Sequence, residues 1–438
     1  MSLHRPPSRP RRAVLGQLAA TCASVALPAV AQAPVTLQVW TWHPDEKSYE
    51  PAVRRFEALN PGLRIQLSVM DSKSLQEKVP LALTTGEAVD VVGIQPQMAG
   101  QLQTYLQDLQ PLLDSVQPGW QQSVVARDLL DCKRSTAGVL KYLSLMRIGA
   151  MLLYYNAELF DRLRLPLPTT LDAFAALVPV LRARAPGVLP VALNGRDSWT
   201  MREVFWTLVA QHGDYVERFL FDGAPLDAQP VQDGLRTLKR WFDSGVFDLD
   251  VLDFEYGQSQ ALFTSGRAAT YVQGSWESWL LSPRLRREKQ VHLDDVGAVA
   301  LPVSPGGRPG LCSFVEVGAA IARQCRHPLA AAKWIAFMHL GEGPQLLARR
   351  NLMIFSKKDV PVAPGLFDRP AGAAGDALLR EMVAQPLAVR LMTTEWQRFT
   401  GVDRAISQVI HGSQTPAHAA QALQQQWLVH QRKTRLPR

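Results

Sequence analysis

Hydrophobic residues follow two alternating periodicities between residues 35 and 94. A β-rich run covers residues 35–40, strict alternation of apolar and polar residues covers 65–69, and a short apolar run covers 89–94. Between them, apolar residues recur at helical spacing over 48–59 and 75–83. This order predicts a parallel sheet covered by helices. Ligands of such sheets bind beyond the carboxyl ends of the strands.

A second series of strands and helices begins near Met151. The predicted strands cover residues 151–155, 188–193, 269–272, 296–301 and 314–322. The predicted helices cover residues 171–184, 231–242, 259–263, 329–340 and 417–428. We therefore expect an α/β protein. A chain of 438 residues, 47% of them hydrophobic, is too long for one ordinary core and predicts about two domains.

The first 31 residues are typical of an export signal. Arg11 and Arg12 precede an apolar stretch that ends near Leu27, too short for a spanning helix. This start resembles the twin-arginine signal, although Pro10 replaces the usual Ser or Thr. We expect cleavage before Gln32. The general secretory route and lipidation at a cysteine of this segment are the alternatives.

The net charge bears on nucleic-acid binding, and the cysteine count bears on disulfide formation. The net charge is +8, but residues 1–31 contain four Arg and no Lys, Asp or Glu, which leaves +4 for the mature chain. That excess is too small to favour nucleic acid. The mature chain keeps Cys132, Cys312 and Cys325. Two redox states are possible for them. Either Cys312 and Cys325 form a disulfide and one thiol remains, or all three are buried thiols.

Short stretches spread over most of the mature chain are similar to one known family. The most specific is Leu153-Tyr154-Tyr155-Asn156-Ala157-Glu158-Leu159-Phe160. The others lie at residues 37–42, 56–62, 78–86, 89–92, 168–170, 261–269, 274–276, 297–302 and 327–334. In number and order they resemble the extracellular solute-binding proteins of ABC importers, family 1, the group that includes maltose-binding protein.

The resemblance implies a two-lobed periplasmic-binding-protein fold of class II topology, with a ligand cleft between the lobes. The expected N-terminal lobe comprises residues 32–145 and 303–341, and the expected C-terminal lobe residues 146–302 and 342–438. Crossing segments are expected near 145–148, near 301–305 and after 340. Ligand binding closes such lobes by hinge motion.

The implied function is a periplasmic receptor, not an enzyme, that captures a sugar or related polar solute and delivers it to the permease subunits of an ABC importer. We expect a monomer with no cofactor. An exported carbohydrate-active hydrolase and a receptor for a signalling partner are the alternatives. The enzymatic signals are poor, since the chain has no His-Glu-x-x-His motif and no complete nucleophile elbow. Its dispersed histidines give no support to a metal site.

A sugar site needs flat aromatic faces and planar polar side chains. The candidate ligand-binding residues are Trp42, His43, Asp45, Gln95, Gln97, Arg147, Arg196, Asp197, Trp199, Trp276 and Trp396. Each aromatic candidate has the alternative of packing inside a lobe, and each polar one that of a solvated loop or cap. Glu316 can face the cleft or solvent. Trp206, Trp241 and Trp334 lie within predicted helices and are expected in the core.

Arg147 departs from the family pattern, because the segment before the first crossing usually reads Ala-Leu-Pro. Arg147 and Arg196 converging on one cleft would need an anion between them. Asp197 or Asp45 is the expected partner, and the alternative is a carboxylate or phosphate on the ligand.

Overall fold

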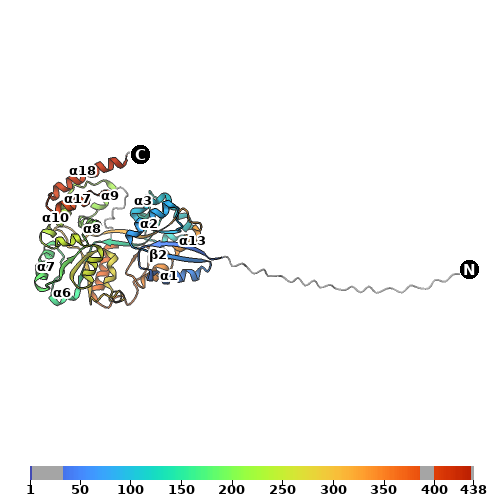
Figure 1. Cartoon of the computed structure of the whole chain (residues 1–438), viewed down its shortest axis with the longest axis horizontal. Coiled ribbons are helices and arrows are strands. Elements are labelled where there is room, and N and C mark those ends of the chain that lie inside the picture. The colour runs from blue at the N-terminus through green and yellow to red at the C-terminus, as the bar shows by residue number, and fades with distance from the viewer. Residues whose placement is uncertain (2–32, 385–398, 436–438) are drawn as a thin grey trace.

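The computed structural model describes residues 1, 33–384 and 399–435, so the predicted export signal lies outside it except for Met1. The chain forms two β-sheets with helices on their faces (Figure 1). We call the part built on the six-stranded sheet the first lobe and the part built on the four-stranded sheet the second lobe. The predicted α/β class is confirmed.

The six-stranded sheet has the order β10-β4-β9-β3-β1-β2. Its strands are β1 (Val35–Thr41), β2 (Leu63–Val69), β3 (Val91–Ile94), β4 (Leu143–Ala150), β9 (Cys312–Ile321) and β10 (Ile354–Phe355). The strand β1 pairs in parallel with both β2 and β3, as the first periodicities predicted. The late strand β9 lies antiparallel between β3 and β4, which joins distant parts of the chain in one sheet.

The helices of the first lobe are α1 (Glu46–Leu59), α2 (Ser72–Thr85), α3 (Pro96–Leu102), α4 (Leu109–Val116), α5 (Ala126–Arg134), α13 (Pro328–His339) and α14 (Gly343–Ala348), with 3-10 turns η1 (Gln103–Tyr105) and η2 (Trp120–Ser123). Asp45 and Asp71 cap α1 and α2 by accepting from the backbone N–H of the third following residue. Gly86 ends α2 at φ +75°, a conformation that glycine adopts without steric cost.

The four-stranded sheet has the order β6-β7-β5-β8. Its strands are β5 (Leu152–Asn156), β6 (Leu189–Ala192), β7 (Ala268–Gln273) and β8 (Val296–Ala300). The helices are α6 (Ala157–Leu163), α7 (Leu171–Arg184), α8 (Ser198–Ala210), α9 (Tyr215–Asp222), α10 (Gln229–Asp243), α11 (Tyr256–Thr264), α12 (Pro283–Glu288), α15 (Pro370–Ala384), α17 (Gly401–Ile410) and α18 (Pro416–Arg435), with 3-10 turns η3 (Leu249–Asp253) and η4 (Ser275–Leu281).

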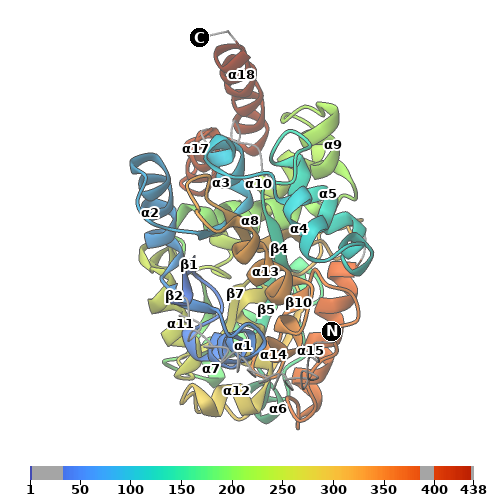
Figure 2. The same cartoon turned by 90° about the vertical axis from the view of Figure 1, so that its right-hand side faces the viewer.

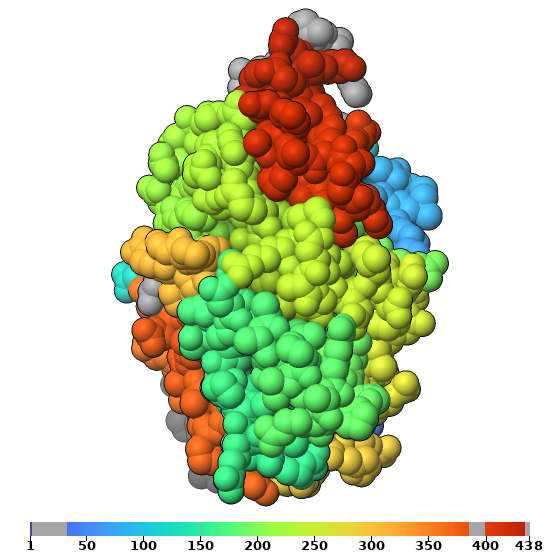
Figure 3. All heavy atoms as spheres, turned by 90° about the vertical axis from the view of Figure 1, so that its left-hand side faces the viewer, coloured from blue at the N-terminus to red at the C-terminus, as the bar shows by residue number. Residues whose placement is uncertain are grey.

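The last helices pack on the second lobe. α17 contacts α8, α10 and α18, and α18 also contacts α10. Figure 3 shows this C-terminal region, in red, covering the green segments of the second lobe. Figure 2 shows the end of α18 projecting beyond the body of the molecule. The helix continues to Arg435, past the predicted end at residue 428.

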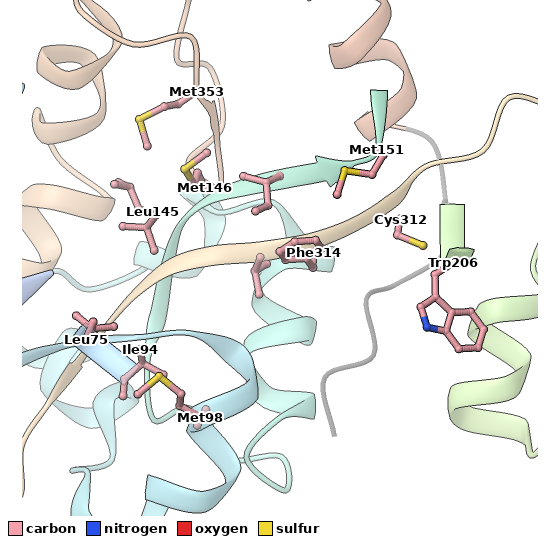
Figure 4. Close-up of a cluster of buried hydrophobic side chains, with 14 of the residues drawn as sticks. Leu75, Ile94, Met98, Leu145, Met146, Met151, Trp206, Cys312, Phe314 and Met353 are labelled. Carbon is pink, nitrogen blue, oxygen red and sulfur yellow. The ribbon is translucent and has the colours of Figure 1, made fainter. Parts of the chain in front are cut away.

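The two lobes are joined by strands that run through the middle of the molecule. β4 continues directly into β5 of the other sheet, and β9 pairs with β4 along seven registered residue pairs. Buried apolar side chains such as Met146, Met151 and Phe314 line this connection (Figure 4). The lobe boundaries inferred from the resemblance stay a prediction.

Cys132, Cys312 and Cys325 are all buried thiols. A Cys312–Cys325 disulfide is therefore wrong, and the alternative of three buried thiols holds. Cys312 begins β9 and Cys325 follows its end. An extended strand rises about 3.3 Å per residue, which carries the two residues far beyond the ~7 Å between Cα atoms that a disulfide spans.

Candidate ligand-binding cleft

A cavity of about 980 Å³ lies between the two lobes. Pockets of this size accommodate small-molecule ligands. The first lobe and its strands contribute Trp42, His43, Pro44, Asp45, Val69, Asp71, Ser72, Lys73, Gln76, Gln95, Gln97, Met146, Ile148, Cys312, Glu316 and Val317. The second lobe and the segment before β10 contribute Asp197, Ser198, Trp199, Arg202, Glu203, Trp206, Val216, Tyr256, Ser275, Trp276, Ser278, Trp279, Lys289, Asn351, Leu352 and Met353.

The first lobe presents the residues that follow its parallel strands. Trp42 comes after β1, Asp71 shortly after β2 and Gln95 directly after β3. Gln97 Nε2 donates to Gln95 Oε1 at 2.7 Å, and Gln95 Nε2 donates to Ser72 Oγ at 2.8 Å. These amides are therefore oriented by the protein. The carboxyl ends of the strands form one wall of the cleft, as the sheet topology predicts.

Four aromatic side chains of the second lobe, Trp199, Tyr256, Trp276 and Trp279, form what we call the aromatic wall. All four line the cavity. Trp199 stands in the first turn of α8, Tyr256 begins α11, and both other tryptophans lie in η4. The ring centroids of Trp199 and Trp276 are 5.7 Å apart in a T-shaped pair, and those of Trp199 and Tyr256 are 6.5 Å apart. Trp199 thus meets Trp276 edge to face and lies against Tyr256 at a tilt of 42°.

Asp197 fixes the starts of α8 and α11, which carry Trp199 and Tyr256 of this wall. Its Oδ2 accepts from Asn194 Nδ2 at 2.9 Å and from the backbone N–H of Tyr256 at 3.0 Å. Asn194 in turn donates to Thr200 Oγ1 at 2.6 Å and accepts from Gln273 Nε2 at 2.9 Å. These bonds join the starts of α8 and α11 to β7. A loop held in this way keeps its aromatic rings in a defined orientation.

Residues 40–339, more than half of the chain, match the model of the family described as bacterial extracellular solute-binding protein. The chain belongs to this family. The predicted family is thereby confirmed, and members of this family are binding proteins.

Similar proteins agree with this assignment. An uncharacterized ABC transporter extracellular-binding protein of Pyrococcus horikoshii is 22% identical over 218 residues, 49% of this chain. The match spans about half, 46%, of the length of that curated relative. The GacH receptor of Streptomyces glaucescens is 17% identical at a TM-score of 0.74, covering 91% of this chain and 99% of its own.

Two further solved structures have the same fold. The maltose-bound MalE3 of T. maritima is 16% identical at a TM-score of 0.73, covering 91% of this chain and 100% of its own. The ABC substrate-binding protein Lmo0181 of Listeria monocytogenes, solved with cycloalternan, is 16% identical at a TM-score of 0.74, covering 92% and 100%. The predicted two-lobed binding-protein fold is confirmed by these matches.

Gly274 of this solute-binding protein lets the Trp276 ring lie close to the backbone. A Cβ atom on Gly274 would lie 2.2 Å from Trp276 Cζ3, far inside van der Waals contact. We predict that Gly274→Ala rotates Trp276 out of its place in the wall and weakens ligand binding about three- to tenfold, because stacking depends on ring geometry. Calorimetric titration checks this. The matched Gly257→Ala variant, whose Cβ meets nothing within 4 Å, should bind normally. Equal affinities of the two variants would contradict the prediction.

The mouth of the cleft has charged residues from both lobes. Asp45 Oδ2 lies 3.7 Å from Lys289 Nζ, which joins the start of α1 to the end of α12 across the cleft. Lys289 also lies over the Trp279 ring at 5.3 Å. Burial lowers the pKa of His43 to about 4, with Asp45 opposing and Lys289 reinforcing the shift. The neutral imidazole therefore offers one donor and one acceptor at neutral pH.

The structure brings together most of the predicted site residues. Trp42, His43, Asp45, Gln95, Gln97, Asp197, Trp199 and Trp276 all line the cavity. Glu316, left open between cleft and solvent, lines it as well. Trp396 lies outside the described residues. Whether the lining residues bind ligand stays a prediction.

The two predicted arginines do not line the cavity. Arg147 is buried, and its guanidinium donates to Asp128 Oδ1 at 2.7 Å, Asp131 Oδ2 at 2.5 Å and Ser313 Oγ at 3.3 Å. Arg196 pairs with Glu255 at 3.3 Å on the surface. The expectation that Asp197 or Asp45 would balance the two arginines is therefore wrong. The carboxylates of α5, 19 and 16 residues before Arg147, approach it because α5 packs on β4.

Sequence reasoning missed Tyr256, Trp279, Lys289 and the residues from Asp71 to Lys73. Two signals were present. Trp279 follows Trp276 by three residues, a spacing that puts both on one side of a 3-10 turn. Tyr256 begins a helix marked by a capping box between Glu255 and Gln258. Trp206 was expected in the core; it is buried, and it also lines the cavity.

The described part of the chain lacks two features. Within residues 33–384 and 399–435, no group of three or more His, Cys, Asp or Glu side chains is placed to hold a metal ion. Over the same residues, none of the helices is both long and apolar enough to cross a membrane.

Proposed function

We propose that this solute-binding protein captures a carbohydrate in its cleft and delivers it to an ABC importer. The aromatic wall is the observation that carries the proposal. Its rings face a cleft whose opposite side presents oriented amides and carboxylates. Aromatic faces suit the C–H surfaces of sugar rings, and planar polar groups suit their hydroxyls.

The charges around the cleft favour a neutral sugar over an acidic one. Among the described lining residues, the cations are Lys73, Arg202 and Lys289, and the carboxylates are those of Asp45, Asp71, Asp197, Glu203 and Glu316. Arg202 forms a salt bridge with Asp403 at 3.1 Å, and Lys289 forms one with Asp45 at 3.7 Å. These two cations are already paired with protein carboxylates, so an anionic ligand would have to compete with a carboxylate for either of them, which costs binding free energy.

Delivery of the bound sugar to an importer would require export of the protein and closure of its lobes on the sugar. The family is extracellular, and the apolar segment after Arg11 and Arg12 supports a periplasmic location with the signal removed. A receptor of this kind needs only affinity and a hinge, and strands β4 and β9 connect the lobes where a hinge would bend. The permease subunits of the importer are the proposed partner.

The proposal is tested by titrating the mature protein with defined sugars. Maltose, maltotriose, raffinose and chitobiose represent neutral oligosaccharides, and each is compared with a uronic acid of similar size. We expect saturable one-to-one binding of at least one neutral sugar, no released product by chromatography, and weaker binding of the acid. Turnover would favour a hydrolase, and preference for the acid would contradict the neutral class.

A further inference from the structure

Glu277 is a buried carboxylate in the 3-10 turn η4, between Trp276 and Trp279 of the aromatic wall. Its side chain is 0% exposed. Its Oε1 accepts from the Tyr256 hydroxyl, from Gln260 Nε2 at 2.7 Å and from the Tyr271 hydroxyl at 3.4 Å. Its Oε2 accepts from Trp279 Nε1 at 2.7 Å. Two of these four donors are rings of the wall, so one carboxylate joins η4 to the start of α11.

We propose that Glu277 is the positioning residue of the aromatic wall, holding the planes of Tyr256 and Trp279 in the orientation that ligand stacking requires. This deepens the proposed function and rests on it, since the wall is the surface on which the carbohydrate would stack. Glu277 itself does not line the cavity. Its influence on the ligand would pass through the two rings that it binds.

The chemistry of the partners favours an ionised carboxylate. Indole Nε1–H is a donor only, and a carboxylate is an acceptor only when ionised. No salt bridge to Glu277 occurs among the described residues, so neutral donors alone satisfy it. Burial raises the pKa of Glu277, while the hydrogen bonds from Tyr256, Gln260, Trp279 and Tyr271 oppose that rise. Charge-assisted bonds of this kind are shorter and stronger than neutral ones.

A buried charge without a cation is a costly way to stabilise a fold, because an apolar residue of similar volume avoids desolvation. What a carboxylate adds over an apolar residue is directional hydrogen bonding, which sets the orientation of its partners. Two of its bonds, those from Tyr256 and Trp279, restrict the rotation of rings that stand at the cavity wall. The orientation then passes on by contact, because Tyr256 lies against Trp199, and Trp199 against Trp276.

The competing explanation is that Glu277 merely joins α11 to η4 and contributes to stability alone. Tyr256→Phe separates the two. The substitution keeps the ring that faces the cleft and removes only the hydroxyl, which donates to Glu277. A purely structural bond would lower the melting temperature and leave ligand affinity unchanged. A positioning bond would lower affinity as well.

The test combines two readouts on Glu277→Gln and Tyr256→Phe. The first is the indole N–H spectrum of protein labelled with ¹⁵N-tryptophan, recorded without sugar and assigned with single Trp→Phe variants. The second is calorimetric titration with the neutral sugar of the panel that binds wild type most tightly. We expect the Trp279 resonance to move in Glu277→Gln, with smaller shifts for Trp276 and Trp199. Affinity should fall about tenfold in Glu277→Gln and by less in Tyr256→Phe.

Asp376→Asn is the matched control. Asp376 is a buried carboxylate of the same lobe, on α15, which packs on η4, and its Oδ2 accepts from Arg380 Nε at 2.8 Å. It is outside the cavity lining. The Asp→Asn change should leave the affinity and the Trp276 and Trp199 resonances as in wild type. Glu277→Gln behaving like this control would overturn the proposal, as would unchanged affinity in Tyr256→Phe.

Failure of the proposed function is distinguishable from failure of this inference. If no sugar of the panel binds wild type, the carbohydrate proposal falls. The indole spectra still decide whether Glu277 fixes the rings, since they need no ligand. Unmoved Trp276 and Trp199 resonances in Glu277→Gln would then reject the positioning role by themselves.

Discussion

Replacing Arg147 by Met should lower the free energy of unfolding by about 3–5 kcal/mol, because two buried carboxylates lose the buried guanidinium that donates to both, and Arg134, 3.5 Å from Asp131, stays beside one of them. Arg147 is 5% exposed, and its partners Asp128 and Asp131 are 2% and 1% exposed. Removing one member of a buried ionic group leaves the desolvated charge of the others uncompensated. Chemical denaturation monitored by circular dichroism measures the loss.

Two comparisons make this prediction specific. Arg196→Met removes a guanidinium whose side chain is 64% exposed beside Glu255 at 60%, and it should change stability by less than about 1 kcal/mol. Adding Asp128→Asn and Asp131→Asn to Arg147→Met should restore much of the loss, since no buried charge then lacks a partner. A single Arg147→Met variant as stable as Arg196→Met would show that α5 and β4 do not depend on this ionic group.

The environment of Arg147 could not be predicted from the sequence. The periodicities predicted the strand and helix order, because local hydrophobic spacing decides which face of each element is buried. Placing a charged residue needs the partner across the fold. Asp128 and Asp131 are 19 and 16 residues away from Arg147, on a helix that the periodicity had not identified. The anion hypothesis arose from that missing contact.

The candidate cleft was more predictable on its first-lobe side than on the other. Residues that follow parallel strands meet at one edge of the sheet. The position of Trp42 and Gln95 in the cleft could therefore be predicted from the strand order alone. The aromatic wall instead starts from helix N-termini and a 3-10 turn. Its members converge through Asp197 and Glu277, whose bonds connect segments as far as 59 residues apart. No local pattern contains such contacts.

Trp276→Ala should weaken binding of the tightest neutral sugar by about 1.5–3 kcal/mol, roughly a ten- to hundredfold rise in Kd. Trp276 lies at the cavity with its ring edge against Trp199, so truncation removes a stacking face and frees its neighbour. The melting temperature should change little, because the ring is only half-buried. Titration calorimetry and thermal melting on the same samples measure both effects.

Two control variants separate a role of Trp276 in ligand binding from a role in packing. Trp276→Phe keeps an aromatic face and should retain part of the affinity. Trp241→Phe changes a ring that is 1% exposed and packed against Phe174 and Phe247, away from the cavity. It should cost stability through the space it leaves and leave the affinity of the folded protein unchanged. If Trp276→Ala instead lost stability at constant affinity, Trp276 would belong to the packing of the second lobe. The ligand would then have to be held by Trp42, Trp199 and Trp279, and the stacking surface would be the rest of the cleft.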